Sequence, residues 1–169
     1  MKVIAIAAIT ANGLIGQTAD QISWEWTSPE DRALLIRLTK EAGAVVLGAR
    51  TFDTFKRRRA FPGRRTIIYT KHPETIAATD IETTAEKPAD LVKRLQNEGA
   101  TGLAVIGGTS IYTQFLSSGC VGELYLTVEP ILFGTGIPLV TNLQTVKLRL
   151  IETGKLNDNT VLLHYAVEK

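Results

Sequence analysis

Residues 103–116 read LAVIGGTSIYTQFL, and this stretch indicates the fold class. Its first four residues are apolar and form a run of strand length. The pair Gly107-Gly108 then predicts a tight turn, and residues 109–116 predict a helix. A strand that passes through a glycine turn into a helix is the repeating unit of α/β proteins, so we expect this strand to lie in a mostly parallel sheet.

The same alternation of strands and helices continues on both sides of this stretch. Helices are predicted where a proline follows a polar residue or a glycine ends an amphipathic run, as in Ser28-Pro29 and Gly43. The expected strands are 3–9, 44–47, 66–70 and 123–128, and the expected helices are 29–42, 50–55 and 88–97. Residues 147–154 and 160–167 read as a hairpin around Asn157-Asp158-Asn159. We therefore predict a mostly parallel twisted central sheet with helices on both faces and a C-terminal antiparallel hairpin.

The chain length and composition fit one globular domain over residues 1–169. It has 44% hydrophobic residues, 19 Lys and Arg, 17 Asp and Glu, and a net charge of +2. This balance predicts no nucleic-acid partner. One cysteine (Cys120) and two histidines (His72 and His164) exclude an internal disulfide and a four-ligand structural zinc site, so we expect no metal centre.

No segment predicts insertion into a membrane. The N-terminal apolar run over 3–9 is too short to span a bilayer. The uncharged stretch 130–146 is interrupted by Pro130, Gly134, Gly136 and Pro138. With no targeting segment visible, we expect a cytoplasmic protein without a membrane partner.

Asp31 is the most informative polar residue. In a helix over 29–42 it shares a face with Leu34, Leu35 and Leu38, the stripe that should meet the sheet. One interpretation is that Asp31 only completes a capping box with Ser28. The other is a carboxyl group at the edge of a pocket, with a raised pKa, that binds a ligand carrying hydrogen-bond donors.

The turn at Gly107-Gly108-Thr109 is a second candidate site. Paired glycines let the backbone approach a ligand closely, and the N-terminus of the next helix suits a diphosphate. The spaced glycines of the full dinucleotide fingerprint are absent, and glycines also serve such turns for steric reasons alone.

Arg64 is a third candidate, because Phe61-Pro62-Gly63-Arg64 predicts a turn that presents it before a buried strand. An arginine there can bind a carboxylate, although the run Lys56-Arg57-Arg58-Arg59 also fits an ordinary solvated loop.

Three further residues have two interpretations each. Trp24 and Trp26 lie in the long loop 10–27 and could shield a site from water or anchor the loop. Thr127 lies in an apolar strand, where its hydroxyl needs a partner if buried, but threonine is also a good strand former.

The order of these features resembles that of dihydrofolate reductases over nearly the whole chain. The matching segments are Ala5-Ile6-Ala7-Ala8, Asn12-Gly13-Leu14-Ile15-Gly16, Trp24, Asp31, Gly48-Ala49-Arg50-Thr51-Phe52, Pro62-Gly63-Arg64, Val105-Ile106-Gly107-Gly108 with Ile111-Tyr112, and Leu124-Tyr125-Leu126-Thr127.

The resemblance implies reduction of 7,8-dihydrofolate to tetrahydrofolate by hydride transfer from NADPH, in a monomer. Asp31 would bind the pterin and assist protonation of N5, with Trp24 and Thr127 beside it. The implied substrate-binding residues are Ile6, Ala7, Leu35, Phe55, Phe61, Arg64 and Ile106. The implied cofactor-binding residues are Ala8, Ile15, Gly16, Ile22, Arg50, Thr51, Thr70, Lys71, Gly107, Gly108, Thr109, Ser110, Ile111 and Tyr112.

The chain departs from the family pattern at several positions. Ala49 and Ser110 stand where basic residues near the cofactor phosphates are frequent, and Arg50 and Lys71 are the nearby cations. Ser23 replaces the usual proline, and Leu35 replaces the usual aromatic residue.

Two alternatives to a dihydrofolate reductase remain. Thr27-Ser28-Pro29-Glu30-Asp31-Arg32 also looks like the reductase domain of riboflavin synthesis, which acts on a ribosylamino-pyrimidine phosphate, and the run 56–59 could bind that phosphate. The other alternative is a nucleotide-binding module without catalytic activity.

Overall fold

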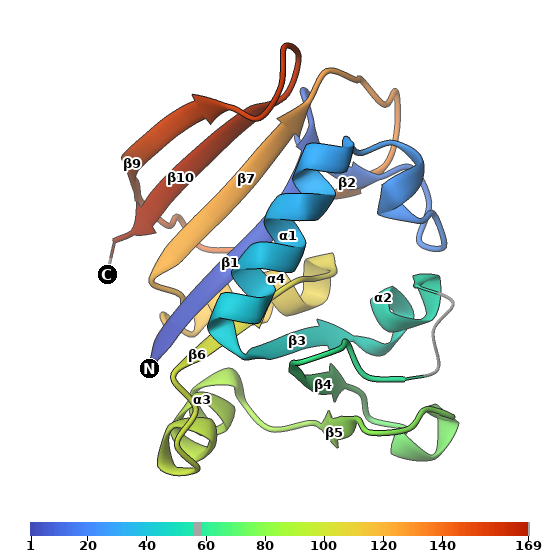
Figure 1. Cartoon of the computed structure of the whole chain (residues 1–169), viewed down its shortest axis with the longest axis vertical. Helices are drawn as coiled ribbons and strands as arrows, with labels where there is room; N and C mark the ends of the chain where they lie inside the picture. Colours follow the sequence, from blue (N-terminus) through green and yellow to red (C-terminus); the bar gives the residue numbers. More distant parts are fainter. Residues whose placement is uncertain (56–58, 169) are drawn as a thin grey trace.

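The central sheet confirms the predicted α/β class. The computed structural model describes residues 1–55 and 59–168. Within them, eight strands lie in the order β5-β4-β3-β6-β1-β7-β10-β9 (Figure 1). Their bounds are β1 (Lys2–Thr10), β3 (Ala44–Gly48), β4 (Arg65–Tyr69), β5 (Glu82–Thr84), β6 (Gly102–Val105), β7 (Glu123–Glu129), β9 (Leu148–Lys155) and β10 (Val161–Val167). The neighbours from β5 to β7 are parallel, whereas β10 runs antiparallel to both β7 and β9, as the predicted hairpin requires.

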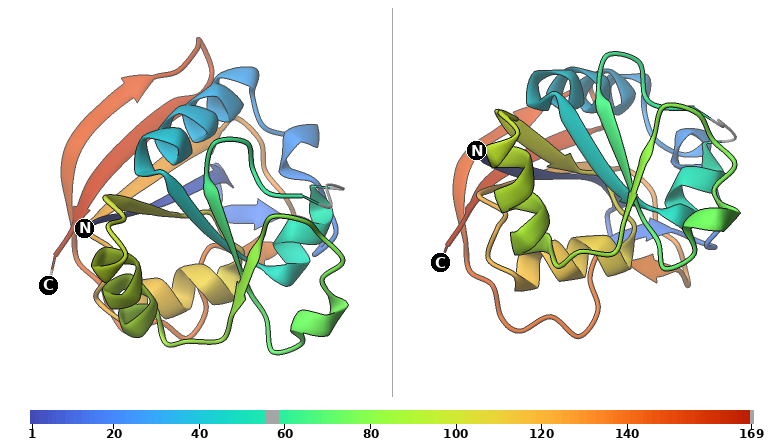
Figure 2. Two further views of the ribbon diagram at one scale, coloured as in Figure 1. Left: turned by 60° about the horizontal axis from the view of Figure 1, so that its bottom comes forward. Right: turned by 90° about the horizontal axis from the view of Figure 1, so that it is seen from below.

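Helices cover both faces of the sheet, as Figure 2 shows. Helices α1 (Pro29–Ala42) and α2 (Ala49–Thr54) pack on one face, and α3 (Pro88–Asn97) and α4 (Thr109–Ser117) pack on the other. The bounds of α1 follow from its sequence. The Ser28 side chain caps its first turn, Pro29 begins it, and Gly43 ends it in the left-handed conformation at φ 77°.

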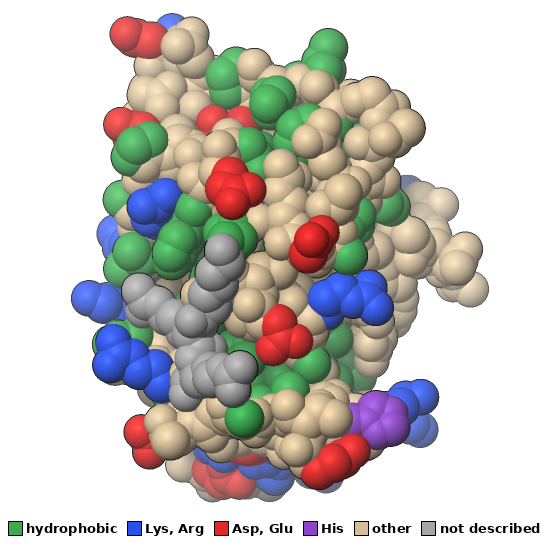
Figure 3. All heavy atoms as spheres, turned by 90° about the vertical axis from the view of Figure 1, so that its right-hand side faces the viewer, with side chains coloured by type: hydrophobic (Ala, Val, Ile, Leu, Met, Phe, Trp, Pro, Cys, Tyr) green, Lys and Arg blue, Asp and Glu red, His purple; other side chains and the backbone are tan. Residues whose placement is uncertain are grey.

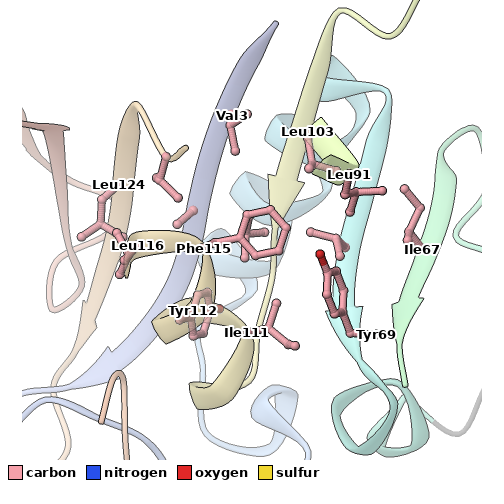
Figure 4. Close-up of a cluster of buried hydrophobic side chains, with 14 of the residues drawn as sticks. Val3, Ile67, Tyr69, Leu91, Leu103, Ile111, Tyr112, Phe115, Leu116 and Leu124 are labelled. Atoms are coloured by element: carbon pink, nitrogen blue, oxygen red, sulfur yellow. The ribbon is translucent and has the colours of Figure 1, made fainter. Parts of the chain in front are cut away.

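The core consists of two layers separated by the sheet. Alternate residues of β1 point to opposite sides, so that Val3 and Ala5 join the layer under α3 and α4, while Ile4 and Ile6 join the layer under α1. Figure 4 shows the first of these layers, in which the fully buried ring of Phe115 lies among side chains from the strands and α3. Both strand faces are buried, which explains why the parallel strands are continuously apolar.

The structure corrects the expectation of an unstructured loop over residues 10–27. This segment contains β2 (Leu14–Gly16) and a short 3-10 helix, η1 (Ser23–Glu25). Strand β2 pairs with β8 (Ile137–Pro138). Strand β8 lies in the stretch 130–146, where the prolines and glycines indicated no regular element. The side chain of Asn12 supports this contact, because its Nδ2 donates to the carbonyl oxygen of Phe133 at 2.7 Å.

Two other short elements were not predicted, β5 and the 3-10 helix η2 (Pro73–Thr75). Strands of two or three residues carry too little periodicity to be predicted from the local sequence, and long-range pairing alone creates them.

None of the helices in the described part of the chain combines the length and the apolar character that crossing a membrane requires.

Candidate functional site

A cavity of about 1090 Å³ opens where β1, β3 and β6 end, at the carboxyl edge of the parallel strands. Ligands of open α/β sheets bind outside this edge, next to the strand-to-helix loops.

Figure 3 shows the surface of the molecule on the side toward which β3 points in Figure 1. Acidic and basic side chains are interspersed there, so the visible described surface favours neither a polyanion nor a polycation.

Asp31 lines this cavity and is 6% exposed. Burial is the largest cause that raises the pKa of its carboxyl group above the ordinary value, and the negative charge of Glu129 raises the pKa further. The hydroxyls of Thr127 and Thr27 and the charge of Arg32 act in the opposite direction. The structure therefore has a buried acid that retains a proton at higher pH than an exposed aspartate does.

The capping-box interpretation of Asp31 is only half correct. Its backbone N–H donates to Ser28 Oγ at 3.2 Å, as a cap requires. However, the Ser28 N–H donates to Glu129 Oε1 at 2.8 Å instead of to the Asp31 carboxylate. The carboxyl group of Asp31 is therefore available to the cavity.

The turn Gly107-Gly108 borders the same cavity, requires glycine at Gly107 and leaves little room for a side chain at Gly108. Gly107 has φ 108°, and a Cβ on it would lie 3.0 Å from the Tyr112 ring. A Cβ on Gly108 would lie 3.0 Å from Thr51 Oγ1. Helix α4 begins at Thr109, so the turn directs its first N–H groups toward the cavity.

Tyr112 connects this turn to the central strand. Its ring is buried, and its hydroxyl donates to the carbonyl oxygen of Ile6 at 2.6 Å. Burial, followed by the negative charge of Asp31, raises the pKa of Tyr112 well above its ordinary value. The tyrosine therefore stays neutral and fixes the distance between β1 and α4 beside the acid.

The cavity brings most of the predicted site residues together. Those that line it are Asp31, Ile6, Ala7, Ala8, Ile15, Leu35, Arg50, Thr51, Phe55, Ile106, Gly107, Gly108, Thr109, Ser110, Ile111 and Tyr112. Those that do not line it are Trp24, Thr127, Phe61, Arg64, Gly16, Ile22, Thr70 and Lys71. The functional roles assigned to either group remain predictions.

The predicted aromatic residues form a row that reaches the cavity at one point. The rings of Trp24 and Phe55 meet edge to face at 5.5 Å, and those of Phe55 and Phe61 do so at 5.1 Å. Only Phe55 of the three lines the cavity. Trp24 therefore supports the wall from behind, and its Nε1 is buried without a hydrogen-bond partner among the described residues.

Arg64 and Thr127 contact other parts of the structure and do not line the cavity. The Arg64 guanidinium donates to Thr39 Oγ1 at 2.7 Å and to the carbonyl oxygen of Pro62 at 3.1 Å. Thr127 is 1% exposed and pairs with Ala8 across β7 and β1, from where its hydroxyl acts on Asp31.

The cavity wall also includes residues for which the sequence predicted no binding role. These are Gln17, Thr18, Ala19, Gln21, Ser23, Gly48, Ala49, Thr54, Tyr69, Thr113, Gln114, Thr135, Gly136, Ile137, Pro138, Thr141 and Asn142. Many of them lie near the β2–β8 contact, and the only available signal was the length of the loop over 10–27. Gly136 is packed so closely there that a Cβ would overlap the backbone of Gly16.

The described part of the chain contains no group of three or more His, Cys, Asp or Glu residues placed to hold a metal ion. Among the described lining residues, Arg50 is the one with a permanent positive charge. Residues 56–58 of the basic run proposed to bind a substrate phosphate lie outside the described residues, and only Arg59 of that run is described.

Comparisons with known proteins agree on the fold. A family model described as dihydrofolate reductase matches residues 2–131. The uncharacterized protein YwjB of Bacillus subtilis (strain 168) is 25% identical over 170 residues, which cover 97% of each chain.

Two solved structures have similar folds at low identity. A Shewanella sp. PV-4 protein named for riboflavin biosynthesis has a TM-score of 0.81 and 20% identity, with all of both chains covered. Dihydrofolate reductase from Enterococcus faecalis, complexed with NADP(H) and RAB-propyl, has a TM-score of 0.78 and 21% identity, with 99% of this chain and 97% of that chain covered.

We expect Gly107→Ala to destabilise the protein by about 1–3 kcal/mol, because alanine tolerates a positive φ poorly and its Cβ would press on Tyr112. Urea unfolding followed by circular dichroism measures this change. Gly134→Ala is the matched control, since Gly134 has no positive φ and nothing lies within 4 Å of an added Cβ. Equal unfolding midpoints for the two variants would contradict the prediction.

We expect Asp31→Asn to increase the free energy of unfolding at neutral pH. Because folding raises the pKa of Asp31, the stabilisation associated with its neutral form is lost as the pH rises through the folded-state pKa. Asparagine is never ionised and avoids this loss. Urea midpoints measured across the acidic and neutral range should converge as the pH falls toward about 3.9, the ordinary aspartate pKa. A constant difference between the two proteins would rule out this origin.

Proposed function

Because this chain belongs to the dihydrofolate reductase family, we propose that it is an NADPH-dependent oxidoreductase that reduces a nitrogen heterocycle held by Asp31. One observation carries this proposal. The buried carboxyl group of Asp31 and the paired glycines before α4 line the same cavity of about 1090 Å³. A volume of this size suits a dinucleotide and a flat substrate bound side by side.

The cofactor side of the proposed site is the turn Gly107-Gly108 with the first residues of α4. The absence of side chains at the glycines leaves room for close approach, and the helix N-terminus favours a diphosphate. Arg50, at the start of α2, adds a positive charge on the opposite wall. When bound, NADPH would supply the hydride. The likeness to the NADP(H) complex of the Enterococcus faecalis enzyme supports this choice of cofactor.

The substrate side is the surface around Asp31, and dihydrofolate is the substrate we propose first. A pterin presents an exocyclic amino group next to a ring N–H, and one carboxylate can accept hydrogen bonds from both. Because burial raises the pKa of Asp31, its protonated form, which can assist proton delivery to N5, persists to higher pH than in an exposed aspartate. The hydroxyl of Thr127 would hold the carboxyl group from the side opposite the substrate.

A riboflavin precursor, a ribosylamino-pyrimidine phosphate, is the second candidate substrate. The high similarity of fold to the Shewanella protein named for riboflavin biosynthesis favours it, as does the sequence TSPEDR at 27–32. An aminopyrimidine has the same neighbouring donors as a pterin, so Asp31 could bind either ring. The two substrates differ in their anionic end, which is a glutamate in dihydrofolate and a phosphate in the pyrimidine.

We expect Asp31→Asn to lower the turnover of dihydrofolate with NADPH by about 10²-fold or more at neutral pH, because asparagine provides no acidic proton. The loss of NADPH absorbance measures turnover. Asp53→Asn is the control, since Asp53 is exposed on α2 and does not line the cavity. Near-normal turnover by the Asp31 variant would remove its proposed role. Oxidation of NADPH only with the pyrimidine phosphate would favour the second candidate.

We expect Arg64→Leu to increase KM for dihydrofolate more than KM for a pterin that lacks glutamate. The reason is the proposed ionic contact between Arg64 and the α-carboxylate of the glutamate. Its bond to Thr39 Oγ1 holds the guanidinium close behind the row of Phe55 and Phe61. Steady-state kinetics with both substrates measures the difference. Equal increases in KM would show that Arg64 has only a structural role.

A further inference from the structure

A second buried acid, Glu129, lies beside Asp31 and has no part in the mechanism described above. It stands at the end of β7 and is 2% exposed. Its Oε1 accepts hydrogen bonds from the N–H and the hydroxyl of Ser28, both at 2.8 Å. Its Oε2 accepts a hydrogen bond at 2.9 Å from the hydroxyl of Thr160, which precedes β10.

These contacts place Glu129 at the junction of three segments. It joins the N-terminus of α1 to the end of β7 and to the turn of the C-terminal hairpin. The Ser28 hydroxyl donates to Glu129 and also accepts from the Asp31 N–H, so hydrogen bonds join the Glu129 carboxyl group to the backbone of Asp31. Bonds in such a chain strengthen one another, and together they fix the first turn of α1, which carries Asp31.

The charge on Glu129 is not required for these hydrogen bonds. A neutral glutamine could accept the bonds from Ser28 through its oxygen and donate its amide to Thr160. Burial of a carboxylate without a cationic partner costs more free energy than burial of an amide. The ion pairs of the described residues do not include Glu129. Exchange of the carboxyl group for an amide therefore separates the effect of charge at this position from that of the hydrogen bonds.

Two charged side chains act on the pKa of Asp31. Glu129 on β7 is the acid that raises its pKa, and Arg32 on α1 is the cation that lowers it. Tyr112 on α4 stays neutral because its own pKa is raised. The hydroxyl of Thr127 on β7 also lowers the pKa of Asp31.

We propose that Glu129 is a positioning residue for the reductase: its hydrogen bonds to Ser28 and Thr160 anchor the first turn of α1 and so fix the place of Asp31, the catalytic acid. This inference rests on the proposed function, because that function makes Asp31 the catalytic acid. It adds a residue outside the cavity that fixes the place of the group inside it, and the negative charge of this residue would also raise the pKa of that group, after the larger effect of burial.

The charge is tested with Glu129→Gln, which keeps the size of the side chain and the bonds from Ser28 and reverses the bond with Thr160. Carboxyl ¹³C NMR of the whole protein, with the Asp31 signal assigned by its absence in Asp31→Asn, gives the pKa of Asp31 directly. We expect Glu129→Gln to lower this pKa, because a like charge has been removed. The part of the pH–rate profile that depends on Asp31 should then move to lower pH.

Glu123→Gln is the matched control for charge. Glu123 also lies on β7 but contacts Lys2, Tyr125 and His164, and it does not act on Asp31. We expect it to leave the Asp31 pKa unchanged. An equal shift in both variants, or none in Glu129→Gln, would overturn the electrostatic part of the proposal.

The anchoring is tested with Glu129→Ala, which removes the contacts with Ser28. We expect KM for the heterocyclic substrate to increase several-fold in this variant, and Glu129→Gln to restore KM without restoring the pH profile. If the alanine variant does not fold, Thr160→Val provides the second test, since it removes one contact and no charge and should shift KM alone. Wild-type KM in these variants would overturn the anchoring role.

The NMR titration does not depend on turnover, so it separates the two proposals. A lowered Asp31 pKa in Glu129→Gln, together with no reduction of either substrate by the wild-type protein, would reject the proposed function and still support the coupling of the two acids.

Discussion

The burial of a carboxyl group at the first turn of α1 is the constraint on which the site depends. An acid can occupy the apolar face of a helix only if other groups compensate for its lost hydration. Here the hydroxyl of Thr127, on the sheet, offsets only part of this cost, because burial still raises the pKa of Asp31 above its ordinary value. The Ser28 cap is itself held by Glu129. The acid is thus presented to the cavity by a polar junction between helix and sheet.

The rest of the site follows from the topology of the sheet. The parallel strands β1, β3 and β6 end at one edge, and each passes into a loop or helix that contributes to the cavity wall. The helices on opposite faces of the sheet contribute different parts of the site. Helix α1 supplies Asp31 from one layer, and α4 supplies its N-terminus and Tyr112 from the other. A cavity lined from both layers has room for two ligands in contact, which the proposed hydride transfer would require.

Local sequence patterns could predict the helices and strands that are long or clearly capped. Pro29 and Gly43 bound α1, and Gly107-Gly108 marks the turn before α4. They could also predict that Asp31 is buried, because its leucine neighbours face the sheet. The contact between Ser28 and Glu129 could not be predicted, since it joins residues that are distant in sequence and meet only when β7 is in place. The pairing of β2 with β8, which closes part of the cavity, could not be predicted either, because these strands are also distant in sequence.

The central position of β1 has a consequence for how the chain folds. Ile4 pairs with Ala104 on one side and Glu123 on the other, so both neighbours of the first strand come from the second half of the sequence. On the ribosome, β1 would emerge long before either neighbour and would remain an unpaired apolar segment. Closing such large loops is entropically unfavourable, and a high contact order slows folding. The arrangement that places Asp31 and the paired glycines around one cavity therefore also prolongs the time for which the nascent chain is open to aggregation or to chaperone binding.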